Sequence, residues 1–379
     1  MNKITMFSSA EKVKGQGVSA AYQEQVNLVK QDSSGKFTIE INKPFPADIS
    51  HYHTIDPIFY LTIPFAKKFG KTVGYVHFLP ETIEGSLKLP KVLKNAFNKY
   101  MISFYKKMDY LVTVNPVFID KLAEYGIDRS KITYIPNFVS DKEFFPQDKK
   151  TIETTRKEWG IHPEAFVVLG VGQVQTRKGV LDFIEIAKLL PDIAFVWAGG
   201  FSFGMITDGY EELKKIVDNP PPNVKFLGII ERSDMNSIYN IADVFFLPSY
   251  NELFPMAILE AMNCNRPLLL RDLDLYNNIL FDFYLKGNSN DEFADLLQRL
   301  AEDSSLYKTW QDKSFEGHKF YGRENVLKLW IDFYDNISKE PSEIRASIKE
   351  LQDYISDHMK NITKIADWIK GKKKLIKKR

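Results

Sequence analysis

The stretch that decides the fold is "NVKFLGIIERSDMNSIYNIADVFFLPSYNELFPMAILEAMNCNRPLLLR", which covers residues 223–271. Its short apolar runs "VKFLG", "DVFFLP" and "PLLLR" are separated by longer, more polar segments. This alternation predicts parallel strands that are connected by helices. Two carboxylates, Glu252 and Glu260, lie on either side of Pro255 in this stretch. The apolar neighbours of Glu260 suggest a helix that is largely covered by protein, and a buried acid needs a partner.

The same alternation continues through most of the chain. Further strands are predicted at "ITMF", "FTIEI", "TVGYVHF", "YLVTV" and "ITYIP" in the first part, and at "FVVLGVG" and "IAFVWAGG" in the second. A polar, proline-bounded stretch separates the two series and places a domain boundary near residue 150. We therefore predict an N-terminal domain at residues 1–148, a second domain at 149–318, a returning helix at 319–340 and a helical extension at 341–379.

The composition predicts a globular protein without disulfide bonds. Hydrophobic residues make up 44% of the chain and charged residues 26%, which is enough apolar material for two cores. The single cysteine, Cys264, cannot form an internal disulfide, and the N-terminal "MNKITMF" lacks the apolar core of a secretory signal. No apolar run has the length that crosses a bilayer. These features predict a cytoplasmic location, with any membrane contact being peripheral.

The C-terminal extension has an apolar seam and a basic end. Apolar residues and His358 recur there with spacings of four and three, at Ile344, Ile348, Leu351, Ile355, His358, Ile362, Ile365 and Ile369. This heptad pattern favours either a homo-oligomer through residues 344–369 or a helix that packs against its own domains. Residues 360–379 contain nine Lys or Arg and one Asp. Together with Trp368, they favour contact with an anionic membrane, and a nucleic-acid-binding arm is the alternative.

Three ordered motifs give the chain a family resemblance. Glu252 and Glu260 are separated by seven residues after a "PS" strand end, and "EAM" and Pro267 follow. "GVGQVQTRKGV" at residues 170–180 and "ITYIPNFVSDKEFFP" at 132–146 precede them. In these motifs the chain resembles family 4 glycosyltransferases, which are retaining enzymes of GT-B fold. Pro255 departs from this pattern, because the family usually has glycine there.

The resemblance implies two doubly wound, Rossmann-like α/β domains that face each other across a cleft, with a helical C-terminal extension. The N-terminal domain would bind the acceptor and the second domain the nucleotide sugar. Ligands of such sheets bind at the carboxyl ends of the strands, so the cleft is the expected active site. Sugar transfer from a diphosphate needs cations for the leaving group and carboxylates near the cationic sugar.

By this resemblance we assign catalytic and donor-binding residues. The catalytic candidates are Glu252 near the donor sugar, His77 on the opposite wall, and Arg177 and Lys178 at the departing diphosphate. Glu260 is expected to accept hydrogen bonds from the ribose hydroxyls. The donor-binding set comprises Gly17, Gly172, Arg177, Lys178, Asn251, Leu253, Phe254, Pro255, Met256 and Glu260.

Two patterns could suit a metal ion, but neither has a complete ligand set. His51 and His53 would share one side of a strand, although no third ligand accompanies them. Asp272 and Asp274 form an acid-x-acid pair in a region that we interpret as a loop after "PLLLR". We expect no metal site, no obligatory metal and no cofactor besides the UDP-sugar donor.

A second enzyme class is suggested by "KGQGVSAA". Gly15, Gly17 and Ala20 have the G-x-G-x-x-A spacing of a dinucleotide-binding turn, and Glu40 follows twenty residues after Ala20. In NAD-dependent oxidoreductases that turn starts directly after the first strand, whereas the first predicted strand here ends near Phe7. The pattern therefore favours an oxidoreductase less than a transferase.

The acceptor is expected to be a lipid. The helix predicted in "LPKVLKNAFNKYMISFYKKMD" would place Val92, Leu93 and Phe104 on one side and Lys91, Lys99 and Lys106 on the other, which is typical of core-facing and membrane-surface helices alike. The chain resembles the bacterial hexosyltransferases that act on diacylglycerol or glycosyl-diacylglycerol in glycolipid and lipoteichoic-acid anchor synthesis. This resemblance implies transfer of glucose or galactose to glucosyl-diacylglycerol with an α linkage. A polysaccharide or protein acceptor, or a degenerate transferase-like binding subunit, remains the alternative.

Overall fold

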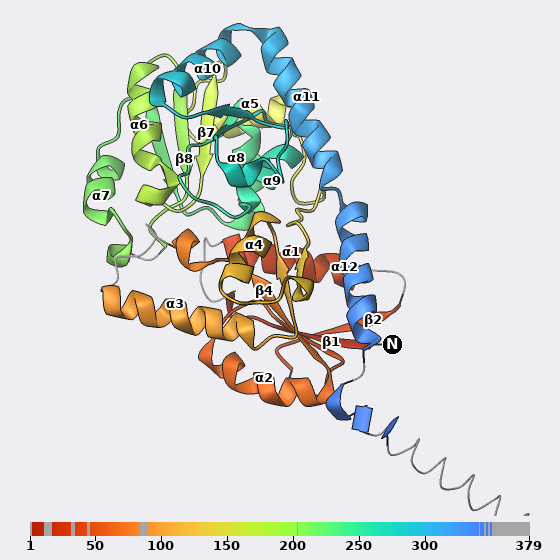
Figure 1. Cartoon of the computed structure of the whole chain (residues 1–379). Helices are drawn as coiled ribbons and strands as arrows, with labels where there is room; N and C mark the ends of the chain where they lie inside the picture. The colour runs from red at the N-terminus through yellow and green to blue at the C-terminus, as the bar shows by residue number, and fades with distance from the viewer. Residues whose placement is uncertain are drawn as a thin grey trace, which may run out of the picture.

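The chain forms two parallel α/β domains. The computed structural model describes residues 2–10, 17–31, 35–43, 46–83, 90–202, 204–340, 342–344, 346–347 and 349–350. Within these residues there are two six-stranded sheets, one in each half of the chain, and all their strand pairs are parallel (Figure 1). The predicted fold class, two doubly wound domains with a helical C-terminal end, is confirmed.

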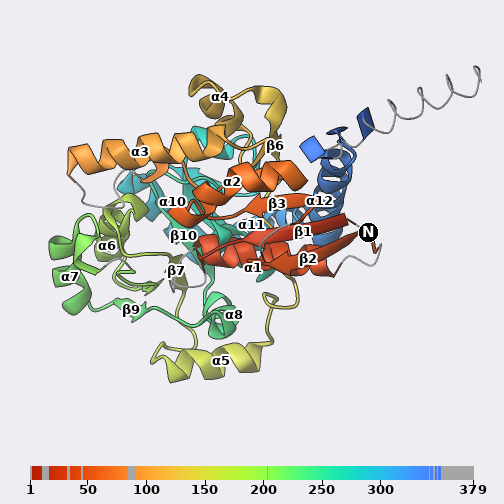
Figure 2. The same cartoon turned by 90° about the horizontal axis from the view of Figure 1, so that it is seen from below.

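The N-terminal sheet has the strand order β2-β1-β3-β4-β5-β6. Its strands are β1 (Asn2–Phe7), β2 (Phe37–Ile41), β3 (Ile49–Tyr52), β4 (Lys71–Val76), β5 (Tyr110–Thr113) and β6 (Ile132–Tyr134). Its helices are α1 (Gly17–Lys30), α2 (Pro57–Phe69), α3 (Lys91–Lys106) and α4 (Val117–Glu124). Figure 2 shows α2 and α3 together on one side of this sheet, and α1 lies toward the second domain.

The second sheet has the strand order β12-β11-β10-β7-β8-β9. Its strands are β7 (Val167–Val171), β8 (Ala194–Ala198), β9 (Val224–Gly228), β10 (Val244–Leu247), β11 (Leu268–Arg271) and β12 (Leu285–Gly287). Its helices are α5 (Lys149–Glu158), α6 (Val180–Leu189), α7 (Tyr210–Asp218), α8 (Arg232–Asn240), α9 (Met256–Asn263) and α10 (Asn290–Glu302). All residues of β10 are fully buried, as expected for a central strand that helices cover on both faces.

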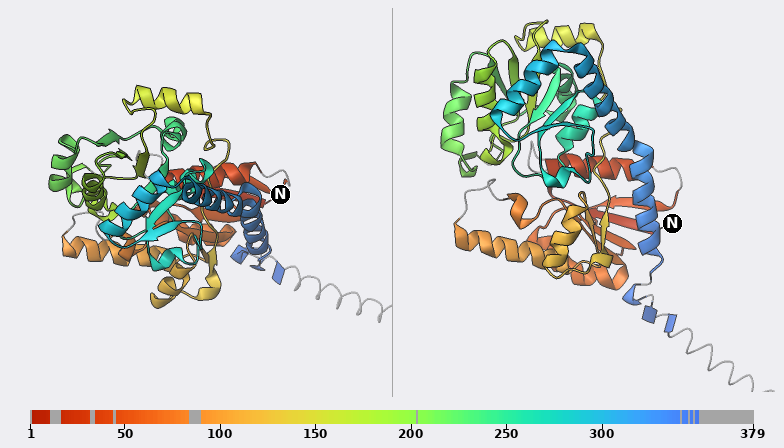
Figure 3. Two further views of the ribbon diagram at one scale, coloured as in Figure 1. Left: turned by 90° about the horizontal axis from the view of Figure 1, so that it is seen from above. Right: turned by 45° about the horizontal axis from the view of Figure 1, so that its top comes forward.

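Two C-terminal helices carry the chain back from the second domain to the first. α11 (Ser304–Phe320) packs on the second domain, and α12 (Arg323–Ser338) runs beside the N-terminal sheet (Figures 1 and 3). Tyr334 of α12 ties this helix to the sheet, because its hydroxyl lies 2.7 Å from His51 Nδ1 and 2.8 Å from Gln25 Nε2. α11 and α12 together therefore connect the second domain back to the N-terminal domain.

Most predicted elements are present, with two differences. β3 and β12 were not in the predicted strand series, because "ISHY" and "LKG" are short and contain few apolar residues. Val92 and Leu93, on the predicted apolar side of their helix, are 79% and 58% exposed, so this end of the helix does not face the core. The reason is visible in Figure 1, where the start of α3 extends beyond the sheet that its later turns cover. The heptad seam and the basic end of residues 351–379 lie outside the described residues.

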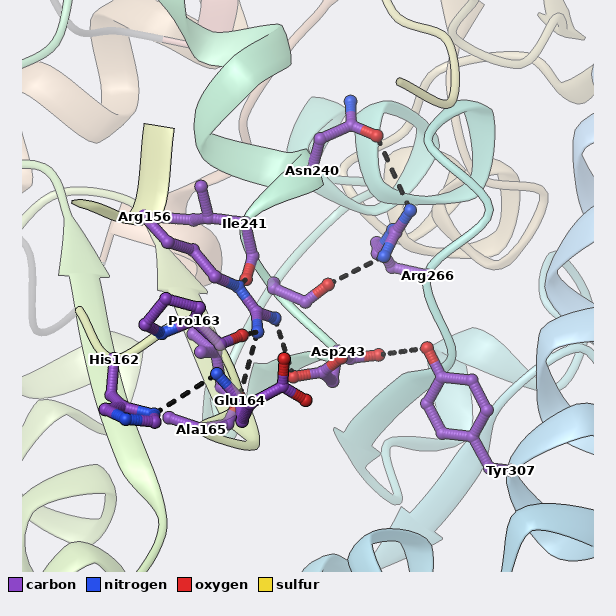
Figure 4. A network of polar contacts seen from close by, with 12 residues as sticks. Arg156, His162, Pro163, Glu164, Ala165, Asn240, Ile241, Asp243, Arg266 and Tyr307 are labelled. Carbon is purple, nitrogen blue, oxygen red and sulfur yellow. Dashed lines mark hydrogen bonds and ion pairs between the residues drawn. The ribbon is translucent and has the colours of Figure 1, made fainter. Parts of the chain in front are cut away.

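A buried arginine supports the base of the second domain (Figure 4). The Arg156 guanidinium donates to the carbonyl oxygens of Ile241, Pro163 and Ala165, and pairs with Asp243 at 2.9 Å. Burial raises the pKa of Asp243, and the pairing with Arg156 opposes that rise. No signal in the sequence indicated this role, because Ile241 and Asp243 lie 85 and 87 positions from Arg156 along the chain.

Replacing this arginine should destabilise the second domain without changing ligand binding. Arg156→Ala leaves a largely buried Asp243 and three carbonyl groups without their donor, so we expect a loss of about 3 kcal/mol in the free energy of unfolding. Urea unfolding followed by circular dichroism measures the loss, and calorimetric binding of UDP serves as the control. An unchanged unfolding midpoint would contradict the supporting role.

Candidate active site

A cavity of about 530 Å³ lies between the two domains. Its walls come from α1, from the residue segments after β4, β7 and β8, and from the start of α9. These segments follow the carboxyl ends of strands in both sheets, where parallel α/β sheets bind ligands. The cleft expected from the sequence therefore exists as a cavity, and the two domains contribute opposite walls.

Two cations and one carboxylate meet on the wall of the second domain. Lys178 Nζ lies 2.5 Å from Glu252 Oε1, and Arg177 Nη1 lies 3.4 Å from the same oxygen. The Ser249 hydroxyl donates to this oxygen as well, at 2.6 Å. All three charged residues line the cavity, and each is mostly buried. The sequence placed these residues in one cleft, and the structure adds that they form one ion-paired cluster.

The cluster fixes the protonation state of Glu252. Burial alone would raise the pKa of its carboxyl, but Lys178 and Arg177 outweigh that effect and hold the pKa below its usual value. Burial lowers the pKa of Lys178, and the attraction of Glu252 opposes that change. Glu252 is therefore ionised at neutral pH, so it can accept hydrogen bonds from sugar hydroxyls but cannot act as a general acid.

Close backbone packing brings these residues together. Gly179 has φ +72°, and a Cβ atom there would lie 2.3 Å from the carbonyl oxygen of Pro248. The Tyr250 N–H donates to the Arg177 carbonyl across the same contact, at 2.9 Å. Only glycine allows this approach, so the loop that carries Arg177 and Lys178 can lie against the loop that carries Glu252.

His77 faces the cavity from the N-terminal domain, directly after β4. Its ring contacts the Tyr75 ring in a tilted arrangement at a centroid distance of 4.1 Å, and burial lowers its pKa to about 3. The buried Nε2 atom has no hydrogen-bond partner within the described part of the chain. A neutral imidazole with an unpaired nitrogen can bind a ligand hydroxyl, as expected for the wall opposite Glu252.

Glu260 lies in α9 and is held by two donors. Tyr239 donates its hydroxyl to Oε2 at 2.6 Å, and Arg232 Nη1 donates to Oε1 at 3.0 Å. The carboxylate is only 6% exposed but lines the cavity. Arg232 lines the cavity too, and sequence analysis assigned it no role.

The other predicted donor residues differ in position. Gly172, Leu253, Phe254, Pro255 and Met256 all line the cavity. Gly17 begins α1, and the residues immediately after it line the cavity. Asn251 is outside the lining set, because its side chain donates to the carbonyl of Glu81 in the N-terminal domain at 2.8 Å.

The loop before α9 is anchored to the N-terminal domain by amides that sequence analysis missed. Asn115 donates to the Leu253 carbonyl at 3.0 Å, and Asn137 donates to the Phe254 carbonyl at 2.8 Å. Pro255 follows with φ −67° and ψ 135°, directly before the first residue of α9. Because proline prefers this φ, the departure from the family's glycine causes no backbone strain here.

The His51–His53 and Asp272–Asp274 pairs do not line the cavity. His51 and His53 are buried side by side, with ring centroids 4.2 Å apart, and Asp272 and Asp274 lie after β11 as expected. Among the residues that the structure describes, no group of three or more His, Cys, Asp or Glu side chains could hold a metal ion. β1 ends at Phe7, well before Gly15, so the spacing argument against a dinucleotide turn is confirmed.

Comparisons with protein families and curated proteins agree on one enzyme class. The family model "Glycosyl transferases group 1" matches residues 151–316, and "Glycosyltransferase Family 4" matches residues 36–143. The alpha-galactosylglucosyldiacylglycerol synthase of Streptococcus pneumoniae is 46% identical over 88% of this chain and 89% of its own length. The processive diacylglycerol alpha-glucosyltransferase of Acholeplasma laidlawii is 27% identical over 66% of this chain and 77% of its own length.

Solved structures share the two-domain fold. The Anabaena protein HepE, solved with UDP and glucose, matches with a TM-score of 0.69 and 14% identity over 90% of this chain and all of its own. The sucrose-phosphate synthase of Thermosynechococcus elongatus matches with a TM-score of 0.72 and 14% identity over 89% of this chain and 99% of its own. At this identity, the likeness concerns the fold.

Proposed function

The chain belongs to the family 4 glycosyltransferases, and from this premise we propose that it moves a hexose from a UDP-sugar to a glycosyl-diacylglycerol, forming an α linkage. The main support for a UDP-sugar donor is the cavity in which Lys178, Arg177 and Glu252 lie opposite His77. The Streptococcus pneumoniae relative, a galactosylglucosyldiacylglycerol synthase by name, supports a glycosyl-diacylglycerol acceptor. Glucose and galactose are both candidate donors.

The positions of the charged side chains define one orientation for the UDP-sugar in the cavity. Lys178 and Arg177 would bind the diphosphate, together with the backbone N–H groups of Met256 and Ala257 at the start of α9. The first N–H groups of a helix have no intrahelical acceptor, so they are available to an anion. Glu252 would accept hydrogen bonds from the sugar, and Glu260 would accept them from the ribose. We propose no obligatory metal, because the two cations supply the positive charge that the leaving group needs.

The reaction keeps the anomeric configuration. The bond between the anomeric carbon and the UDP oxygen breaks, and the acceptor hydroxyl attacks from the same face. The departing diphosphate takes the proton of that hydroxyl, so UDP and the α-glycoside are the products. Lys178 and Arg177 stabilise the charge that develops on the diphosphate, and His77 holds the sugar from the opposite wall. Glu252 stays ionised throughout, beside the positive charge that develops on the sugar.

An apolar helix face supports peripheral membrane contact. Ile58, Leu61 and Phe65 recur along one side of α2 and are 64%, 66% and 58% exposed. Lys67 and Lys68 follow in the last turn of the same helix. Apolar side chains beside lysines suit the surface of an anionic membrane, where the lipid acceptor lies. No helix in the described residues is long and apolar enough to cross a membrane. We propose the inner face of the cell membrane as the site of action.

Removing this apolar face should weaken vesicle binding. The triple variant Ile58→Ser, Leu61→Ser, Phe65→Ser replaces three apolar side chains that would be buried in the membrane surface. We therefore expect vesicle affinity to fall by about tenfold or more. Sedimentation with phosphatidylglycerol vesicles at physiological salt measures this change. Leu189→Ser, at an exposed position on α6, is the matched control. A chain that ends at Glu340 separates the contribution of α2 from that of the basic end, and equal sedimentation of the triple variant and wild type would contradict the assignment.

The choice of acceptor is tested by turnover. Release of UDP from UDP-glucose and UDP-galactose should increase strongly when glucosyl-diacylglycerol vesicles are added, and much less with soluble polysaccharide or protein. A preference for a soluble acceptor would retain the transferase and reject the lipid. Absence of turnover with every donor and acceptor would favour the degenerate binding subunit.

A further inference from the structure

Arg232 connects three segments of the chain that are distant in sequence. It is the first residue of α8, and its guanidinium meets a carboxylate on each of three sides. Nη1 donates to Glu260 at 3.0 Å, Nη2 to Glu24 at 2.5 Å, and Nε to Glu143 at 3.0 Å. Glu260 belongs to α9, Glu24 to α1 of the N-terminal domain, and Glu143 to the segment between the domains. Figure 3 shows α1 lying between the two domains, where this bridge forms.

The guanidinium has little freedom in this position. It is a rigid plane whose N–H groups point in set directions, so contacts on two sides determine the direction of the third. The Phe144 ring lies 5.0 Å from its central carbon and adds a further contact. Glu24 is only 3% exposed and also accepts the Ser140 N–H at 3.2 Å, which gives it a defined position.

Glu260 keeps room for a ligand while it is held. A carboxylate has about four lone-pair sites, two on each oxygen. Tyr239 occupies one site on Oε2, and Arg232 occupies one on Oε1. Each oxygen therefore retains a site, which matches the two adjacent hydroxyls of a ribose. Because both Glu260 and Arg232 line the cavity, this arrangement lies where a nucleotide would bind.

Resting on the proposed function, in which Glu260 binds the ribose, we propose that Arg232 is a positioning residue. It orients Glu260 toward the ribose hydroxyls, and Glu24 of the N-terminal domain holds Arg232 in that orientation. Recognition of the ribose by the second domain thus depends on a side chain of the first domain. The contact joins residues that are 208 positions apart, and it makes nucleotide selectivity a property of both domains.

Binding of UDP and of 2′-deoxy-UDP to the full chain tests this inference. Wild type should bind UDP about 10–100-fold more tightly than 2′-deoxy-UDP, because the lost hydroxyl donates to a charged acceptor. In Glu24→Ala, this ratio should fall below about threefold, mainly through weaker UDP binding. Glu24→Gln keeps an acceptor for Arg232 and should restore most of the ratio. Glu40→Gln, in an ion pair with Lys3 at the outer edge of the N-terminal sheet, should not change it.

The results distinguish ribose binding by Glu260 from the positioning role of Arg232. A wild-type ratio near one would reject ribose binding by Glu260, the part of the proposed function on which this inference rests. A normal wild-type ratio that persists in Glu24→Ala, with an unchanged melting temperature, would overturn the positioning role alone. Should Glu24→Ala fail to fold, Arg232→Lys provides the same test. It keeps the charge but cannot direct three donors in one plane, so its ratio should fall as well.

Discussion

Glu252→Gln is expected to lower the turnover of hexose transfer by about 10²- to 10³-fold while the fold remains intact. The amide oxygen can still accept hydrogen bonds from Lys178 and Ser249, so the side chain keeps its place. The negative charge beside the anomeric carbon is lost, and that charge matters most when the sugar becomes cationic. Turnover with saturating UDP-hexose and glycolipid vesicles measures the effect.

The matched control is Glu185→Gln, which removes an exposed carboxylate from the ion pair with Lys188 on α6. It should leave turnover unchanged. Glu252→Ala should be at least as inactive as Glu252→Gln, with an unchanged circular dichroism spectrum. Near-normal turnover in either Glu252 variant would contradict the catalytic assignment.

Lys178→Met should reduce turnover by about 10²-fold or more, because a cation that faces the departing diphosphate is lost. The pH dependence should change as well. Lys178 holds the pKa of Glu252 below its usual value, so without Lys178 the effect of burial dominates and this pKa rises. Residual activity depends on ionised Glu252. As the pH is lowered, this activity should therefore be lost at a higher pH than wild-type activity is. A pH profile of kcat/KM measures the shift.

Lys178→Arg is the control for charge, and it should keep the acidic limb of the profile near its wild-type position. Arg177→Ala should chiefly weaken donor binding, since this side chain also donates to the Asn251 carbonyl at 2.5 Å and supports the loop. An acidic limb that does not move in Lys178→Met would contradict the electrostatic coupling between Lys178 and Glu252.

The sequence predicted the fold well where the signal is local. The strands of both sheets are short apolar runs, and β10 and β11 were predicted within the stretch that carries Glu252 and Glu260. Pro255 was assigned to the donor-binding set, and it directly precedes α9. The strand β12 was missed because "LKG" contains a single apolar residue and so shows no strand pattern.

The site was predicted less completely, because its geometry depends on contacts between distant residues. The motif around Arg177 and Lys178 indicated a donor site, but the ion pair with Glu252 depends on Gly179 packing against Pro248. Arg232 gave no local signal, since its partner Glu24 lies 208 positions earlier in the other domain. The same reason applies to the amides of Asn115 and Asn137, which hold the loop before α9.

The product that the full chain forms from UDP-hexose and glucosyl-diacylglycerol vesicles tests the proposed function most directly. Nuclear magnetic resonance of the extracted lipid determines both the number of hexoses and the configuration of the new linkage. We predict a dihexosyl-diacylglycerol whose new bond has the α configuration of the donor, formed in equal amount to the UDP released. A β-linked product, or release of UDP with free hexose and no new lipid, would contradict it.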